Sequence, residues 1–430
     1  MMRIWAGAVS WIIGIFILGF IAEKSQFETI LAGYGLAFGG FMIMSQEFSD
    51  RSRFVILIII AFIGRILLIT STPQLSDDVY RFIWDARLQA DGIPLLKGTP
   101  REMLSEGIVH GAFYEKLFPF LNSPDYFTVY PTVIQWLNRS AIWISGENHL
   151  AFMIILRLFH LMADITSFLA IGSIAKRMGL KSSPAFWYIL NPLLIVECSG
   201  NMHYEGIAIA LLLIAITYAG KGITASSAFF SSAILVKLNP ALLMPLLIKY
   251  WKLQRGLYFL LITMAITFVG LFLGFGEDLL KLKNSILLYY KSFEFNAGVY
   301  YSIREIARWY IGYNAIAYIG PSLFVFSALS ILLITLRSET SSIRGMITGA
   351  FISYSIYIFF STTIHPWYIL FPLVLGIFTI WRRIAIIWSF VVLFSYSHYW
   401  NGLNEPSWPW MIAEYMILII AFLVTLRKVK

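Results

Sequence analysis

Charged side chains are scarce in this sequence. They make up 13% of its 430 residues, whereas a soluble globular domain carries roughly 25%. Hydrophobic residues make up 59%, which is more than a water-soluble core can bury. A bilayer accommodates them, because each helix that crosses the hydrocarbon needs about 20 mostly apolar residues. The composition therefore predicts an all-α, polytopic transmembrane protein without a soluble domain of any size.

Other features are missing as well. Cys198 is the single cysteine, so an intrachain disulfide is excluded. The sequence has no glycine-rich phosphate loop, no HExxH and no CxxC motif, which argues against an ATP-driven pump or a zinc protease. It also has no Ser/Pro-rich linker and no clear internal repeat. We therefore interpret residues 1–430 as a single domain.

Apolar runs follow one another along the whole chain. About fourteen of them are predicted to form membrane helices. The first run begins Met-Met-Arg and looks like an uncleaved anchor. The predicted helices cover residues 4–22, 28–45, 53–71, 150–175, 184–199, 204–219, 223–237, 239–249, 256–274, 314–336, 344–362, 366–380, 384–398 and 410–426.

The net charge of +9 comes from short basic clusters between these runs. Lysine and arginine gather in cytoplasmic loops, so membrane topology explains the clusters and we expect no nucleic-acid binding. Both termini are then cytoplasmic, residues 131–145 form an interfacial helix on the outer surface, and 223–249 make a shallow hairpin or a reentrant dip. The clusters are Lys176/Arg177/Lys181, Lys249/Lys252/Arg255, Arg382/Arg383 and Arg427/Lys428/Lys430.

This topology places three long segments on the extracytoplasmic side, at 72–149, 275–313 and 399–409. The first follows residues 1–71, which hold three predicted helices, and it precedes the remaining helices of 150–430. We expect functional residues to lie in these extracytoplasmic segments.

The most informative stretch of that loop runs from Ser76 to Arg87. Ser76 is predicted to cap a short helix, which places Asp77 and Asp78 in its first turn, where the helix dipole favours ionised carboxylates. Arg81 lies one turn further on and shares a face with each aspartate. The same short helix also carries the indole of Trp84 and the carboxylate of Asp85. Together with the acid pair and Arg81, these side chains suit a sugar site.

Two other interpretations of this loop stay open. The charges can simply be solvated and cap the helix. Alternatively, Asp77 and Asp78 can hold a divalent cation such as Mg²⁺ or Mn²⁺ through their oxygens, instead of one of them accepting a proton.

Ionisable residues also interrupt an apolar helix. Arg157, His160 and Asp164 share one face of the segment 150–175. Intramembrane ionisable groups are rare and usually functional, so these three could form the relay of a secondary transporter or lipid-linked-sugar flippase. A structural ion pair between Arg157 and Asp164 is the simpler alternative.

Further polar and aromatic residues lie where helices turn at the predicted outer surface. Each alone is typical of a membrane interface, where Trp and Tyr are common. Together they predict a ring of polar groups at one level of the membrane. The ring comprises Asn201, His203, Glu205, Lys237, His365, Trp367 and Tyr368.

Short strings spanning about residues 70–370 resemble, in the same order, the GT-C superfamily of membrane glycosyltransferases. They most resemble its bacterial mannosyltransferase branch and the catalytic subunit of GPI mannosyltransferase I. The GPI enzyme has an Asp-x-Asp spacing where this chain has adjacent acids. The strings are Ser76–Arg87, Asp91–Pro94, Val129–Pro131, Leu156–Asp164, Asn191–Leu193, Gly200–Glu205, Val236–Pro240, Phe295–Ala297 and His365–Tyr368.

The resemblance implies an inverting transferase that moves a hexose, with mannose expected, from a polyprenyl-phosphate carrier to a glycan, lipid or protein. It also implies that residues 1–71 comprise two extra N-terminal helices and a first core helix, and that 72–149 is a catalytic loop. The expected location is the cytoplasmic membrane of a bacterium, with the active site facing outside. Asp77 matches the first acid of the related motif and is predicted to be the general base, with Asp78 positioning Arg81 or the acceptor. A non-catalytic assembly subunit is a further alternative. The residues expected to bind substrate are Arg81, Trp84, Asp85, Tyr130, Arg157, Asp164, His203, Glu205, Lys237, Arg304, His365, Trp367 and Tyr368.

Overall fold

The computed structural model describes residues 2–180, 184–402 and 404–429. Within them the secondary structure is helical, apart from one isolated bridge between Phe295 and Thr363. This confirms the predicted all-α class. Lys181 and Lys430, which belong to two of the basic clusters, lie outside the described residues.

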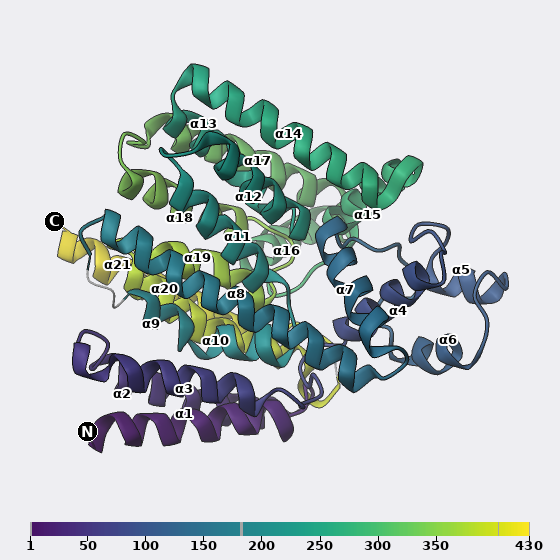
Figure 1. Ribbon diagram of the computed structural model, residues 1–430, viewed down its shortest axis with the longest axis horizontal. Helices are drawn as coiled ribbons and strands as arrows, with labels where there is room; N and C mark the ends of the chain where they lie inside the picture. Colours follow the sequence, from purple (N-terminus) through teal and green to yellow (C-terminus); the bar gives the residue numbers. More distant parts are fainter. Residues whose placement is uncertain (1, 181–183, 403, 430) are drawn as a thin grey trace.

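The chain forms a bundle of long helices with a lobe of short helices at one end (Figure 1). The bundle begins with α1 (Met2–Phe20), α2 (Phe27–Ser45) and α3 (Phe54–Leu67). The lobe follows directly, as α4 (Asp78–Ala90), α5 (Pro100–Ser105), α6 (Ala112–Leu117) and α7 (Thr132–Ser145). Residues 72–149 therefore fold as a separate helical cap on the bundle, and α7 matches the predicted helix at 131–145.

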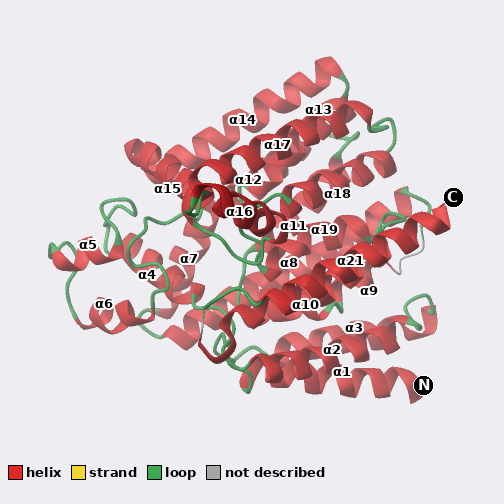
Figure 2. Cartoon of the chain, turned by 180° about the vertical axis from the view of Figure 1, so that it is seen from behind, coloured by secondary structure: helices red, strands yellow, loops and turns green. Residues whose placement is uncertain are grey.

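The remaining chain returns to the bundle, where its long helices lie beside one another in both views (Figures 1 and 2). The elements up to α14 are α8 (His149–Arg177), α9 (Pro184–Ile189), α10 (Pro192–Leu194), η3 (Ile195–Gly200), α11 (Glu205–Tyr218), α12 (Ile223–Val236), η4 (Asn239–Leu243), α13 (Met244–Trp251) and α14 (Leu253–Phe275). The rest are α15 (Leu279–Ser292), α16 (Gly298–Ile311), α17 (Ile316–Arg337), α18 (Ile343–Phe359), η6 (Pro366–Ile369), α19 (Leu370–Gly376), α20 (Arg382–Val391), η7 (Val392–Gly402) and α21 (Trp408–Val429).

Six helices in the described part of the chain are long and apolar enough to cross a membrane. They are α1, α2, α8, the run Leu253–Leu282 that extends α14, α17 and α21. A seventh span is possible if Pro192–Gly200 and Glu205–Tyr218, which meet at 114°, count as one bent segment. The predicted segment 184–199 is broken before Pro192, and 366–380 forms a short 3₁₀ turn at Pro366–Ile369 followed by α19. Proline breaks a helix because it lacks the N–H donor and clashes with the preceding turn.

Basic side chains tie several helix ends together. Arg177 at the end of α8 donates to the last carbonyls of α11, and Lys249 on α13 donates to carbonyls at the end of α17. Arg382 lies 5.2 Å from the ring centroid of Trp187 on α9. Unsatisfied carbonyls at helix C-termini attract cations. These contacts lie toward the end of the bundle that carries both termini, opposite the lobe (Figure 1).

Glycines bring α1 and α2 into close contact. An added Cβ at Gly40 would lie 2.4 Å from the Gly7 carbonyl oxygen, and one at Gly14 would lie 2.4 Å from the Ala37 nitrogen. Small residues of this kind let helix backbones approach each other in membranes. The first two helices therefore form a tight hairpin, which fixes the position of the turn between them.

We expect Gly40→Ala to lower the stability of the protein by about 1–3 kcal/mol, because the added methyl overpacks the helix contact. Thermal unfolding of the detergent-solubilised protein measures this effect. Gly39→Ala is the matched control, since an added Cβ there meets open space. Equal melting temperatures for the two variants would contradict the predicted role of the glycine contact.

Candidate functional site

The acid pair lies at the start of α4, close to the predicted position. The helix begins at Asp78, and Asp77 occupies the N-cap position without making a side-chain cap bond. Ser76 was predicted to be the cap, and this is wrong by one residue. Its hydroxyl instead accepts a 3.3 Å hydrogen bond from the backbone N–H of Asp78. Both carboxylates therefore stay free of capping and reach other partners.

Asp78 is held on several sides. The Asn122 amide donates a 2.7 Å hydrogen bond to Oδ1, and Nε2 of His203 lies 3.7 Å from Oδ2. Burial alone would raise the pKa of Asp78, but the interaction with charged His203 and the hydrogen bond from Asn122 lower it far below its usual range. Burial and the charge of Asp78 raise the pKa of nearby Tyr130 well above its usual range. Asp78 is therefore a firmly ionised group beside a neutral phenol.

His203 connects Asp78 to a second buried carboxylate. Its Nδ1 lies 3.1 Å from Oε2 of Glu197 in η3, and its Nε2 lies 3.2 Å from the Ser76 hydroxyl. The ring stacks on Trp367, with centroids 3.6 Å apart. An imidazole between two carboxylates is stabilised in its charged form. This histidine therefore links the lobe to the interior of the bundle.

Glu197 has further partners. It accepts hydrogen bonds of 2.8 Å from the Tyr396 hydroxyl and 3.2 Å from the Asn201 amide. Met202, which lies in the break between η3 and α11, has a φ of 61°, a left-handed conformation that is uncommon outside glycine. Irregular backbone at membrane depth is tolerated where protein buries it, and Met202 is fully buried. The break therefore brings Glu197, Asn201 and His203 together.

Asp77 has a different environment. It forms an ion pair with Lys24, which lies in the turn between α1 and α2. The Lys24 side chain is 41% exposed and that of Asp77 is 36% exposed. Of the two acids, Asp77 is thus the more accessible, and its partner comes from the N-terminal hairpin. Lys24 is absent from the residues predicted to form the site.

The predicted polar ring does assemble. Lys237 Nζ lies 2.5 Å from Oε1 of the fully buried Glu205 and 5.5 Å from the ring centroid of Tyr368. His365 stacks on Trp367 at 4.4 Å, on the same indole that His203 contacts. Burial lowers the pKa of His365 to about 3. This imidazole is therefore neutral at neutral pH and could offer a hydrogen bond but no positive charge.

Three residues predicted to bind substrate serve instead to pack the lobe. Arg81 donates to Asp85 at 2.8 Å and to the carbonyls of Ser123 and Tyr126. Asp78 is not among these partners of Arg81. The structure therefore does not show Asp78 positioning Arg81, as was predicted. Trp84 is fully buried and its ring contacts Tyr114 and Phe118, so neither face is open to a sugar. The face of α4 that carries Arg81 and Asp85 holds the lobe together.

The charged residues of α8 do not form the predicted network. Arg157 donates to the carbonyls of Ile69, Ser199 and Gly200 and to the Ser71 hydroxyl. Asp164 pairs with Arg65 of α3 at 2.6 Å, a residue that the sequence pattern did not single out. The alternative of a structural ion pair holds for Asp164, but its partner is wrong. These contacts explain the two charges as links between helices.

Arg304 on α16 is neutralised by its neighbours. It pairs with Glu294 at 2.5 Å and with Glu305 at 2.7 Å. Its guanidinium also lies 4.5 Å from the ring centroid of Tyr301. A phosphate that binds this arginine must displace two carboxylates, so Arg304 is a weaker candidate than the sequence indicated.

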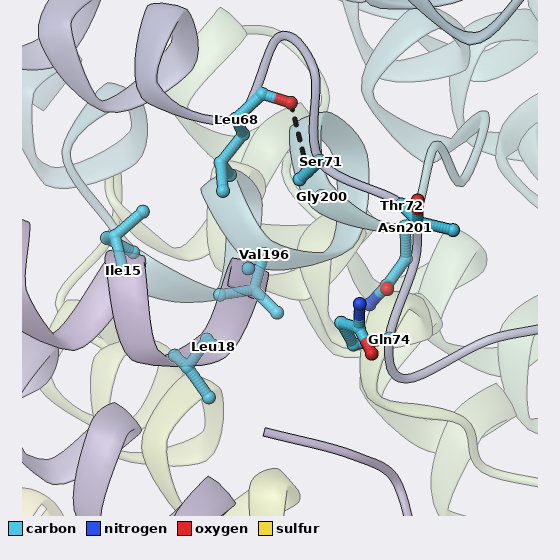
Figure 3. Close-up of a pocket in the computed structure, with 10 residues that line it drawn as sticks. Ile15, Leu18, Leu68, Ser71, Thr72, Gln74, Val196, Gly200 and Asn201 are labelled. Carbon is cyan, nitrogen blue, oxygen red and sulfur yellow. Dashed lines mark hydrogen bonds between the residues drawn. The ribbon is translucent and has the colours of Figure 1, made fainter. Parts of the chain in front are cut away.

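A small recess lies between the ends of α1 and α3 and the break between η3 and α11 (Figure 3). It is next to residues 71–74, which precede Asp77 and Asp78. Asn201 lines it and also accepts a hydrogen bond from the Leu75 backbone. In the ranges that the structure describes, no group of three or more His, Cys, Asp or Glu residues is arranged to hold a metal ion. Asp77 and Asp78 therefore bind a cation only if further ligands come from substrate or water.

Long apolar helices around a buried polar cluster define this chain as a polytopic membrane protein. The sequence model for "Alpha-(1->6)-mannopyranosyltransferase, N-terminal domain" matches residues 18–253, which is more than half of the chain. The chain therefore belongs to this family. The match includes α4, the bent pair and Lys237.

Related proteins occur in Mycobacterium tuberculosis and Corynebacterium glutamicum. An α-(1→6)-mannopyranosyltransferase of Mycobacterium tuberculosis is 26% identical over 175 residues, 40% of this chain and 29% of the relative. α-(1→6)-mannopyranosyltransferase A of the same organism is 25% identical over 191 residues, 43% and 34% of the two chains. Its counterpart in Corynebacterium glutamicum is 24% identical over 187 residues, 42% and 36%. The matches thus span about a third of the length of these relatives.

We predict that the Arg65–Asp164 pair is structural. Arg65→Met should lower stability by about 3–5 kcal/mol, because it leaves a buried carboxylate without its cation. The double variant Arg65→Met/Asp164→Leu should recover most of that loss. Thermal unfolding measures both variants, and Arg101→Met, which breaks an exposed ion pair with Asp125, should change little. If Arg65→Met is as stable as the wild type, the assignment is wrong.

Proposed function

We propose that this protein is an integral membrane mannosyltransferase that moves mannose from a polyprenyl-phosphate donor to a hydroxyl of an acceptor, with inversion at the anomeric carbon. The observation that carries the proposal is the acid pair at the start of α4, in a chain of the α-(1→6)-mannopyranosyltransferase family. The names of the relatives suggest an α-(1→6) linkage. The donor, the acceptor and the side of the membrane are parts of this proposal.

Asp77 is the proposed general base. The acceptor oxygen attacks the anomeric carbon, the bond from that carbon to the phosphate oxygen breaks, and the hydroxyl proton passes to the Asp77 carboxylate. The lipid phosphate leaves with the bonding electron pair, and Asp77 later returns its proton to solvent. Its partial exposure supports this role, because a base must come within hydrogen-bond reach of the acceptor.

Asp78 is the proposed positioning residue. Its oxygens already face Asn122 and His203, and a carboxyl with so low a pKa is a poor proton acceptor. It holds the start of α4 against the bent helix pair and so orients Asp77. Lys237, which pairs with Glu205 in the polar ring, is the proposed source of positive charge near the leaving phosphate.

The test is transfer of labelled mannose from polyprenyl-phosphate-mannose to membrane lipids by the purified protein. Asp77→Asn should lower transfer by at least about 100-fold, in line with the loss of a general base, while melting temperature stays near that of the wild type. Asp78→Asn should reduce transfer less and lower the melting temperature, because His203 loses a charged neighbour. Full transfer by both variants would remove this loop from the catalytic centre. Transfer from a sugar nucleotide alone would overturn the proposed donor.

The proposed active site faces the outside of the cell. Reporter fusions after Arg255 and Arg383 should report a cytoplasmic position, since basic clusters stay inside. A fusion near Gly92, in the lobe at the opposite end of the bundle (Figure 1), should report the outside. The same location for all three fusions would contradict the predicted topology.

A further inference from the structure

The cations around the acid pair differ in how firmly they are held. Lys237 pairs with a fully buried carboxylate, and Arg81 pairs with buried Asp85 while it also binds two backbone carbonyls. Lys24 pairs with Asp77, and both of these side chains are more than a third exposed. Breaking a buried ion pair is strongly unfavourable, whereas an exposed one contributes little. Lys24 is therefore the cation that changes partner at the least cost.

The backbone that carries Lys24 is well fixed. The Ser25 carbonyl accepts a 3.0 Å hydrogen bond from the Asn401 backbone, and Phe27 packs against Trp400 and Trp410. The tight contact of α1 with α2 holds the same turn. A lysine side chain on such a turn has a flexible four-carbon stem. Its ammonium can therefore reorient while its attachment point stays in place.

We propose that Lys24 binds the phosphate of the lipid-linked sugar donor and, by doing so, releases Asp77 to act as the base. This inference rests on the proposed function. In the resting protein Lys24 pairs with Asp77. An incoming phosphate competes for the ammonium, because ammonium groups form strong, charge-assisted hydrogen bonds with phosphate oxygens.

The exchange links donor binding to base availability. Until a donor is bound, the Asp77 carboxylate is occupied by Lys24, which withholds it from other proton donors. Once Lys24 has moved to the phosphate, it also neutralises the extra negative charge that appears there as the sugar leaves. Lys24, which lies in the turn of the N-terminal hairpin, then serves both donor binding and the departure of the phosphate.

A phospholipid headgroup offers the same chemistry as the donor phosphate. Both present a phosphate diester that a lysine at the membrane surface could bind. The test therefore measures two ligands separately, polyprenyl-phosphate-mannose and phosphatidylglycerol. Equilibrium binding is measured with the full chain in nanodiscs of uncharged lipid.

Lys24→Ala should weaken binding of polyprenyl-phosphate-mannose by about 10- to 100-fold, the effect of losing a hydrogen bond to a charged group. Lys24→Arg should restore most of the affinity. Lys116→Ala removes an exposed lysine of α6 and serves as the control with unchanged affinity. Normal donor affinity in Lys24→Ala, with donor binding and transfer intact in the wild type, would overturn the inference alone. Loss of phosphatidylglycerol binding only would overturn it in favour of a headgroup contact.

Asp77→Asn supplies the decisive comparison. Because the carboxylate competes with phosphate for Lys24, its removal should tighten donor binding by about threefold, the scale of an exposed ion pair, even though transfer is lost. The double variant Lys24→Ala/Asp77→Asn should bind no better than Lys24→Ala. Weaker or unchanged donor binding in Asp77→Asn would refute the exchange. A wild type that neither binds nor uses this donor would overturn the proposed function together with the inference.

Discussion

The placement of His203 between two carboxylates is the interaction on which the candidate site depends. Glu197 approaches one ring nitrogen and Asp78 the other, and a charged imidazole in such a buried place is tolerable only when it is paired. The pairing requires the bent segment to break at Met202 and α4 to begin where it does. Tyr396 and Asn201 then complete the coordination of Glu197. One buried charge thus joins the lobe, the bent pair and a C-terminal element.

Two kinds of ion pair lie near the candidate site. Arg65 with Asp164 and Arg81 with Asp85 are nearly inaccessible to solvent and hold elements together. The pair of Lys24 with Asp77 is exposed, so it can break and form again at little cost. In the proposed reaction this contrast matters, because a rigid framework would keep the reacting groups aligned while an exchangeable contact would allow substrate to enter. The framework lies around α3, α4 and α8, and the exchangeable contact joins it to the first hairpin.

Helix positions were predictable from the sequence because a membrane span is a local property. The predicted segments at 4–22, 28–45 and 410–426 agree with α1, α2 and α21 to within about two residues at nearly every end. Partners were not predictable, because pairing is non-local. Asp164 shares a helical face with Arg157 but bonds to Arg65, which lies on another helix. Lys24 and Glu197 were missed for the same reason, whereas the polar ring around Lys237 and His365 was found because its residues lie at helix turns.

The wide separation of the contributing residues affects how the protein is made. Lys24 and Glu197 leave the ribosome well before Tyr396, which donates to Glu197. Until that tyrosine arrives, Glu197 lacks one of its hydrogen-bond donors, and a partly satisfied buried carboxylate is costly. Nascent chains therefore carry an unfinished polar cluster until Tyr396 has been synthesised. A chain truncated before Tyr396 would keep a buried carboxylate that lacks one of its hydrogen-bond donors, and this distinguishes it physically from the folded protein.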